Sequence, residues 1–224
     1  MKLFKERTQN FDNMNQYDLV KRTKRENFRY LNETKALPDQ TVLFGDSITE
    51  IFNWYELFYD FSKASGQAVY NRGISGDTTN RLLERLYDNA LNITPKNLVI
   101  LIGTNDLGNG APIEYPLGNI EKLIMEINKT CPNTNIILEA VYPVNKKMNT
   151  TALGMVGRRS NETIKELNFE LKKIADKYRC IWLDLTDKLA DSKGNLNSLY
   201  CYDGLHLNAK GFTVVAENII PLLK

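Results

Sequence analysis

The sequence predicts an α/β fold, a three-layer sandwich in which a parallel β-sheet of five strands carries helices on both faces. Short apolar runs alternate along the chain with segments whose apolar residues recur every three or four positions. The run at 98–102 (LVILI) is wholly apolar, as expected of a central parallel strand that is buried on both faces. Strands and helices that alternate in this way build a parallel sheet, for which the strand order 2-1-3-4-5 is common.

Composition favours a soluble globular protein. Of 224 residues, 42% are hydrophobic and 25% are charged, and the formal net charge of +2 does not favour a nucleic-acid partner. Cys131, Cys180 and Cys201 are an odd number without C-x-x-C spacing, which predicts reduced thiols rather than disulfides or a zinc site. The first residues lack the apolar core of a signal peptide, and no run approaches the ~18 apolar residues of a membrane span. We therefore expect a cytoplasmic protein that binds neither membranes nor nucleic acid.

Residues 1–38 form a polar, charged segment ahead of the first strand. Apolar residues interrupt this segment at Phe11, Met14, Tyr17, Val20, Phe28 and Leu31. From Asn13 to Thr34 their spacing predicts an amphipathic helix, which Pro38 ends. We expect this helical extension (1–38) to lay its apolar stripe on the main body (39–224), the two together making a single domain. A contact in a homodimer or a lid over the substrate is the alternative.

Five apolar or β-branched runs are predicted as strands, at 41–44, 68–70, 98–102, 136–141 and 180–185. Helices with one apolar face are predicted after them, at 48–58, 77–91, 117–130, 164–174 and 212–220. Asp77 is the expected N-cap of the second of these helices. The segments 144–158 and 186–205 are expected to be irregular.

Three of the strands run into polar turns that contain glycine: Gly45-Asp46-Ser47, Gly73-Ile74-Ser75 and Gly103-Thr104-Asn105-Asp106. Because the carboxyl ends of parallel strands share one edge of the sheet, these turns should meet there. Ser47 stands between a strand and a helix, where a substrate carbonyl can approach it. Ser47 is therefore the candidate nucleophile, although its turn does not fit the G-x-S-x-G pattern.

His206 is the only histidine of the chain, so any chemistry that needs a histidine base must use it. Asp203, three residues upstream, can hold Nδ1–H and leave Nε2 free to take the proton of a hydroxyl. Acyl transfer also needs donors for the developing oxyanion. Gly73 can offer a backbone N–H at close range, and Asn105 can offer its side-chain amide.

The order and spacing of these residues resemble the four sequence blocks of the GDSL-type hydrolases, also called the SGNH superfamily. Ser47 in GDSIT matches the serine block, Gly73 in NRGISGDTT the glycine block and Asn105 in GTND the asparagine block. Asp203 and His206 in DGLHLN match the final block.

The resemblance covers the chain from about Thr41 to the C-terminus. Ile48 stands where the family name has leucine, a conservative change, and residues 1–38 lie outside the family core. The resemblance implies a flavodoxin-like SGNH-hydrolase sandwich, ester hydrolysis through an acyl-enzyme, and neither a metal nor a cofactor. It places the oxyanion hole at the N–H groups of Ser47 and Gly73 and the side chain of Asn105.

The residues of these sequence blocks are most similar to those of small bacterial esterases related to the platelet-activating-factor acetylhydrolase branch. This similarity implies a short acyl group but no particular alcohol. The leading hypothesis is a serine esterase for small esters, such as an acetyl ester of a sugar or a lysolipid-like compound. A thioesterase or lysophospholipase for longer chains is the alternative within the enzymes, and a non-catalytic carbohydrate-binding module is the alternative outside them. A nucleotide-binding protein is disfavoured, because the chain has no G-x-x-x-x-G-K-[ST] motif.

Further polar residues fall near the predicted site. Asp46 and Asp106 should brace its turns, and Asp46 and Tyr142 are candidates for contact with the substrate. Arg158 and Arg159 fit a solvated helix start, with a clamp on a charged substrate as the alternative. Both tryptophans, Trp54 and Trp182, are expected in the core.

Overall fold

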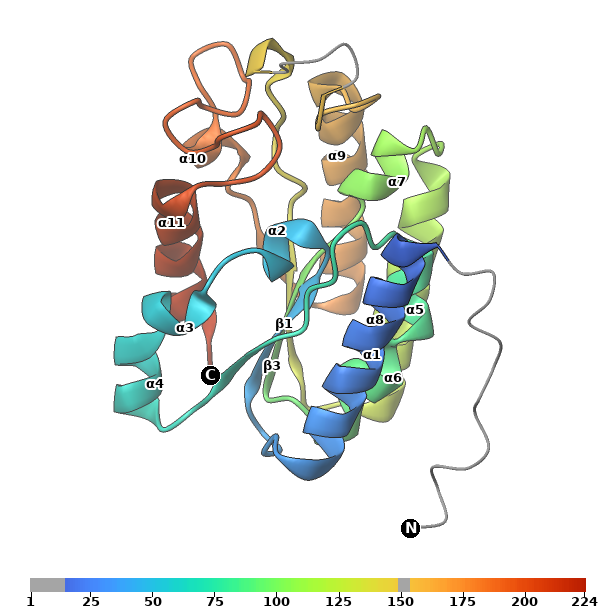
Figure 1. The fold of residues 1–224 in the computed structure, drawn as a ribbon, viewed down its shortest axis with the longest axis vertical. Helices are drawn as coiled ribbons and strands as arrows, with labels where there is room; N and C mark the ends of the chain where they lie inside the picture. Colours follow the sequence, from blue (N-terminus) through green and yellow to red (C-terminus); the bar gives the residue numbers. More distant parts are fainter. Residues whose placement is uncertain (1–14, 149–153) are drawn as a thin grey trace.

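The computed structural model describes residues 15–148 and 154–224, and it has the three-layer α/β/α architecture (Figure 1). All strand pairs are parallel, and the sheet order is β2-β1-β3-β4-β5. The strands are β1 (Thr41–Gly45), β2 (Val69–Asn71), β3 (Asn97–Leu101), β4 (Asn135–Glu139) and β5 (Ile181–Leu183). The predicted parallel sheet and its strand order are confirmed.

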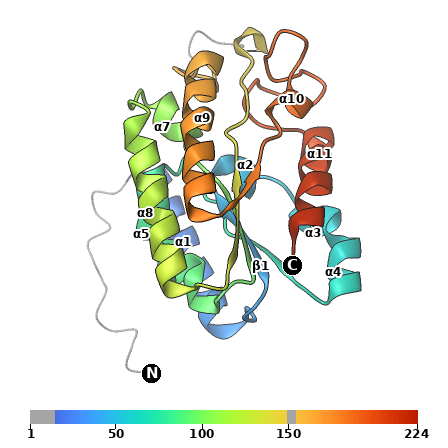
Figure 2. The same cartoon turned by 180° about the vertical axis from the view of Figure 1, so that it is seen from behind.

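Helices cover both faces of the sheet, as two opposite views show (Figures 1 and 2). One face carries α1 (Gln16–Thr34), α5 (Thr79–Glu84), α6 (Leu86–Asn89), η1 (Leu91–Ile93), α8 (Glu114–Thr130) and α9 (Asn161–Tyr178). The other face carries α3 (Trp54–Leu57), α4 (Tyr59–Ser65), α10 (Thr186–Leu189), α11 (Ala209–Ile219) and η3 (Ile220–Leu222). The remaining elements, α2 (Ser47–Glu50), α7 (Thr104–Gly108) and η2 (Lys146–Met148), follow the carboxyl ends of strands. Across the described ranges, no helix is long and apolar enough to cross a membrane.

Alternate residues of each strand enter two separate apolar cores. Val42 and Phe44 of β1 pack with the inner faces of α5, α8 and α9, whereas Leu43 packs with Trp54 and Phe212 on the opposite face. Side chains of a strand point alternately to the two faces of the sheet. The central strands are therefore buried on both sides, and their apolar sequence follows from that.

The predicted continuous helix over 48–58 is wrong, because the chain forms two short helices there, α2 and α3, and a third, α4, begins only at Tyr59. The carbonyl of Thr49 accepts hydrogen bonds from Trp54 Nε1 and from Asn71 Nδ2, so the end of α2 is bound by side chains instead of a further helical turn. Ile51 and Tyr55 are consequently exposed, while Trp54 is buried as predicted.

The predicted N-cap at Asp77 is also wrong. Helix α5 begins at Thr79, and the carboxylate of Asp106 accepts hydrogen bonds from both the backbone N–H and the hydroxyl of Thr79. Asp77 instead binds Arg85 at 2.7 Å. The carboxylate of Asp106, distant in the sequence, thus binds the first residue of α5. This contact agrees with the bracing role expected of Asp106.

The apolar stripe predicted for the N-terminal helix faces the domain only in part, because Phe28 is half-buried with its ring centre 5.0 Å from the Arg72 guanidinium. Tyr17, Val20 and Leu31 are 55%, 47% and 39% exposed, whereas the buried residues of α1 are Lys21 and Asn32. The part of that prediction at positions 11–14 lies outside the described residues. Helix α1 packs against α6 and η1 through a polar face.

One arginine joins the ends of the first two strands beneath the polar turns. Arg85 is 1% exposed, and it donates to Arg72 O at 2.7 Å, to Gly45 O at 2.8 Å and to Asp77 Oδ2 at 2.7 Å. Its guanidinium also lies 4.4 Å from the centre of the Phe44 ring. Burial lowers the pKa of Arg85 to about 10, so the side chain stays charged at neutral pH.

Replacing this arginine should strongly destabilise the fold. In Arg85→Met, Asp77 loses its closest ionic partner and two backbone carbonyls lose a charged donor, so the free energy of unfolding should fall by about 3–5 kcal/mol. Urea denaturation followed by circular dichroism measures the change. The control Arg29→Met removes only surface contacts to Glu26 and Glu33 and should change stability by less than about 1 kcal/mol. A loss of that small size in Arg85→Met would contradict the structural role.

Candidate active site

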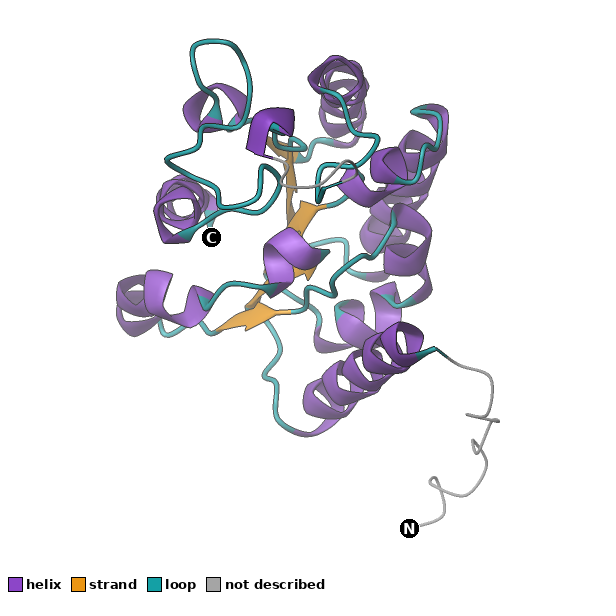
Figure 3. Ribbon diagram, turned by 45° about the horizontal axis from the view of Figure 1, so that its top comes forward, coloured by secondary structure: helices purple, strands orange, loops and turns teal. Residues whose placement is uncertain are grey.

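Ser47 is the first residue of α2, two residues after Gly45, the last residue of β1. Asp46 caps this helix, since its Oδ1 accepts a hydrogen bond from Ile48 N at 3.0 Å. The cap turns the chain sharply at the carboxyl edge of the sheet, where α2 lies over the strand ends (Figures 1 and 3). Ser47 itself is 7% exposed.

His206 reaches Ser47 from a loop 159 positions further along the chain. Its Nε2 lies 2.9 Å from Ser47 Oγ, and its Nδ1 lies 2.7 Å from Asp203 Oδ2. The loop is shaped locally, because Asp203 Oδ1 accepts hydrogen bonds from the backbone N–H groups of Leu205 and His206. Gly204 has a φ of +84°, a conformation that favours glycine. The structure thus joins the predicted serine, histidine and aspartate in one hydrogen-bonded line.

The carboxyl group of Asp203 is held in its charged form. Burial alone would raise the pKa of Asp203, but hydrogen bonds from the His206 ring and from two backbone N–H groups outweigh burial and lower it. An ionised Asp203 favours the tautomer with its proton on Nδ1, which leaves Nε2 to accept a proton from Ser47.

Tyr202 was not predicted as a site residue. Its ring stacks on the imidazole of His206, with centroids 5.9 Å apart and an interplanar angle of 15°. The side chain is largely exposed, so it covers one face of the imidazole from the solvent side. The only feature of the sequence that could have pointed to Tyr202 was its position next to Asp203.

Gly73 packs directly on the backbone of the helix that carries Ser47. A Cβ at this position would lie 2.4 Å from Glu50 N and 2.8 Å from Asp46 O, distances that no side chain tolerates. The N–H of Gly73 donates to Asn71 Oδ1 at 2.9 Å. Glycine is thus required here by close packing against α2.

Asn105 is fixed by hydrogen bonds at both ends of its amide. Its Nδ2 donates to Asp77 O at 2.9 Å and lies 3.3 Å from Asp46 Oδ2. Its Oδ1 accepts from Arg159 Nη2 at 2.7 Å, which settles the direction in which the amide points. Asn105 is the second residue of α7, which follows β3 at the same edge of the sheet as Ser47.

The expectation that Arg159 is solvated is wrong, although Arg158 is exposed as expected. Arg159 is 7% exposed, and besides Asn105 it binds Thr104 Oγ1 at 2.8 Å and Val156 O at 3.0 Å. Its guanidinium packs against Gly108, where a Cβ would lie 2.5 Å from Cζ. Arg159 therefore connects the segment after residue 154 to the amide of Asn105.

The two candidate substrate contacts, Asp46 and Tyr142, are both buried. Asp46 is fully buried, which raises its pKa to about 7, and its carboxylate binds groups of the protein. The Tyr142 hydroxyl donates to Glu139, and burial raises the pKa of Glu139 to about 7. This placement favours a supporting role for both residues over contact with a substrate.

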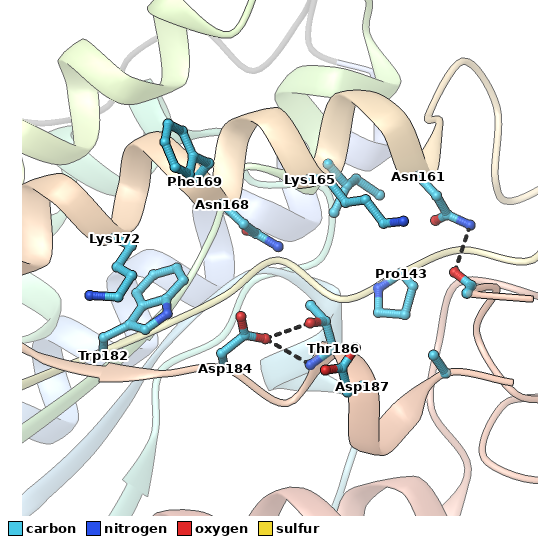
Figure 4. Close-up of a pocket in the computed structure, with 13 residues that line it drawn as sticks. Pro143, Asn161, Lys165, Asn168, Phe169, Lys172, Trp182, Asp184, Thr186 and Asp187 are labelled. Carbon is cyan, nitrogen blue, oxygen red and sulfur yellow. Dashed lines mark hydrogen bonds between the residues drawn. The ribbon is translucent and has the colours of Figure 1, made fainter. Parts of the chain in front are cut away.

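A cleft of about 310 Å³ lies elsewhere, between α9 and the segment that follows β5 (Figure 4). Exposed Phe169 and half-buried Trp182 line it, so Trp182 is less enclosed than expected. In its wall, Asp184 Oδ1 accepts from Thr186 N and Oγ1 at 2.9 and 2.6 Å. None of the predicted site residues lines this cleft.

Comparison with known proteins gives consistent matches. Residues 43–214 match the sequence model of the GDSL-like lipase/acylhydrolase family. The chain is 29% identical over 200 residues to platelet-activating factor acetylhydrolase IB subunit alpha1 of Bos taurus, across 87% of this chain and 79% of that protein.

Solved structures agree with the sequence matches. A protein from Streptococcus pneumonia, named after platelet activating factor, is 30% identical, with a TM-score of 0.81 over 91% of this chain and 92% of that one. A GDSL-like lipase from Bacteroides thetaiotaomicron is 24% identical, with a TM-score of 0.73 over 87% and 94% of the two chains. The family match spans Ser47, Gly73, Asn105, Asp203 and His206.

Gly73→Ala should damage the site itself. The added methyl group cannot fit against Glu50 N and Asp46 O, so the turn must move away from α2, and kcat for ester hydrolysis should fall at least about tenfold. The matched control is Gly118→Ala in α8, where a Cβ meets nothing within 4 Å. This control should keep full activity and gain about 0.5–1 kcal/mol in stability. Equal activity of the two variants would contradict the close packing described here.

Glu139 should make stability depend on pH. Its pKa rises on folding from 4.5 to about 7, so the folded state binds the proton more tightly, and stability falls as pH rises from about 4.5 to 7. In Glu139→Gln the part of this loss that comes from Glu139, up to about 3 kcal/mol, should disappear from urea unfolding curves measured at pH 5 and pH 8. The part from Asp46, whose pKa burial also raises to about 7, should remain. The control Glu126→Gln changes an exposed residue and should keep the wild-type dependence. Identical dependence in Glu139→Gln and wild type would show that Glu139 titrates normally.

Proposed function

Because the chain belongs to the GDSL-like lipase/acylhydrolase family and is a carboxylic-ester hydrolase, we propose that it is a serine esterase for short-chain esters, acetyl esters above all. The reaction would pass through an acyl group on Ser47. The observation that carries this proposal is the hydrogen-bonded line from Ser47 Oγ through His206 to Asp203. Nucleophile, base and orienting carboxylate stand in the order that acyl transfer requires.

In the proposed first step, Ser47 Oγ attacks the ester carbonyl while His206 Nε2 takes the hydroxyl proton. The 2.9 Å separation lies within the range for direct proton transfer. The carboxylate of Asp203 stabilises the imidazolium that forms. His206 then gives the proton to the leaving alcohol, and the acyl group stays on Ser47.

The proposed oxyanion hole consists of the N–H groups of Ser47 and Gly73 and of the Asn105 amide. Ser47 begins α2, so its N–H has no acceptor within that helix. To donate to the oxyanion, the Gly73 N–H must either leave Asn71 Oδ1 or form a bifurcated hydrogen bond to both acceptors. Asn105 is held by Arg159 and by Asp77 O, which limits its reorganisation during the reaction.

Deacylation repeats the same chemistry with water. His206 Nε2 takes a proton from the water that attacks the acyl carbon, and it returns this proton to Ser47 Oγ as the carboxylic acid leaves. The preference for short acyl groups is supported by the acetylhydrolase name of the relatives across 87% of this chain.

Hydrolysis of p-nitrophenyl acetate by wild type and Ser47→Ala tests the mechanism. We expect kcat/KM to fall by about 10⁴-fold or more in the variant, because the nucleophile is lost. Ser192→Ala, which changes an exposed turn, is the control and should keep wild-type activity.

A series of p-nitrophenyl esters tests the acyl preference. Turnover should fall steeply beyond four carbons. Rising turnover toward eight or more carbons would favour the thioesterase or lysophospholipase alternative, and activity that survives Ser47→Ala would reject the acyl-Ser47 mechanism.

A further inference from the structure

The polar face of α1 lies against the turn formed by residues 73–77. Tyr17 Oη donates to Ser75 O at 3.1 Å. Lys24 forms an ion pair with one oxygen of Glu50, and the other oxygen of Glu50 accepts a hydrogen bond from Ser75 N. Both polar groups of the Ser75 backbone are therefore tied to α1, one directly and one through the last residue of α2.

Lys21 makes a third contact with this turn. Its Nζ lies 3.7 Å from Asp77 Oδ1, and both side chains are nearly inaccessible to solvent. Burial lowers the pKa of Lys21, so the helix carries an ammonium group in an unfavourable environment. A buried ion pair contributes little net stability compared with apolar packing, although removal of one partner is costly. This contact is thus better suited to fixing a geometry than to holding α1 on the domain.

Gly76 shows that the turn and α1 fit each other closely. Its φ is +70°, and a Cβ there would lie 1.8 Å from Tyr17 Oη and 3.0 Å from Lys21 Nζ. The turn approaches α1 at a position without a side chain, so it can shift toward the helix no further. A shift away from the helix would break the contacts of Tyr17 and Lys21.

These contacts are close to two donors of the proposed oxyanion hole, the Gly73 N–H and the Asn105 amide. Ser75 is two residues after Gly73, and Asp77 O accepts the hydrogen bond of Asn105 Nδ2 at 2.9 Å. Movement of the turn would therefore displace the Gly73 N–H and loosen the Asn105 amide together.

We propose that Tyr17, Lys21 and Lys24 of α1 are positioning residues, which hold the 73–77 turn so that Gly73 and Asn105 face the developing oxyanion. The inference rests on the proposed function, and it concerns a helix outside the 43–214 match to the family. It gives the N-terminal helix a role in turnover, separate from contact with substrate and from apolar packing.

The test measures kcat, KM and the pH profile for p-nitrophenyl acetate in Tyr17→Phe, Lys21→Met and Lys24→Met. We expect kcat to fall about 5–20-fold, most in Lys21→Met because its ion pair is the most buried, while KM stays within twofold. The apparent pKa of the pH profile should not move, because the contacts of His206 with Ser47 and Asp203 are untouched. Lys24→Arg, which keeps the charge facing Glu50, should keep wild-type kcat.

Arg29→Met is the control on the same helix, because among the described residues Arg29 forms ion pairs only with Glu26 and Glu33 of α1, and its kcat should not change. Thermal melts ensure that every variant is assayed fully folded. Unchanged kcat in all three variants, or a fall matched by Arg29→Met, would overturn the positioning role. Activity that survives Ser47→Ala would instead reject the proposed function, so the two failures are distinguishable.

Discussion

The site depends on the buried contact of Arg85 with Asp77 and with the carbonyls of Gly45 and Arg72. Backbone carbonyls at the ends of parallel strands need donors once they leave the sheet, and here one guanidinium serves the ends of both β1 and β2. Ser47 lies two residues after Gly45, and Gly73 is the residue after Arg72. Together with the backbone hydrogen bond from Ile74 N to Gly45 O, this buried cation links the segment of the proposed nucleophile to that of one of its oxyanion donors.

The polar groups around this arginine form one connected network. Asp77 binds Arg85 and Lys21 through its carboxylate and Asn105 through its carbonyl. Arg159 holds the other end of the Asn105 amide. Such preorganised donors lower the cost of reorganisation when charge develops on the substrate. Asp203 and His206 do not depend on this network, because a local turn holds them.

The sequence predicted the sheet and the site residues because both have short-range signals. The LVILI run is apolar throughout, and each polar turn follows a strand, so the pairing of β1 with β3 places the turns that hold Ser47 and Asn105 at neighbouring strand ends. Lys21, Arg85 and Arg159 were not predicted as buried, since apolar periodicity assigns charged residues to solvent. Their burial depends on distant partners, as does the break after α2, where Asn71 binds the carbonyls of Thr49 and Glu50. Such partners are known only once the chain is folded.

Intact-mass spectrometry after incubation with a fluorophosphonate tests directly whether Ser47 is the nucleophile. This reagent forms a stable bond with an activated serine and mimics the tetrahedral intermediate. We predict a single adduct on the wild type that is absent from Ser47→Ala. A folded wild type without an adduct, or an adduct that persists in the variant, would contradict the assignment of Ser47 as the nucleophile.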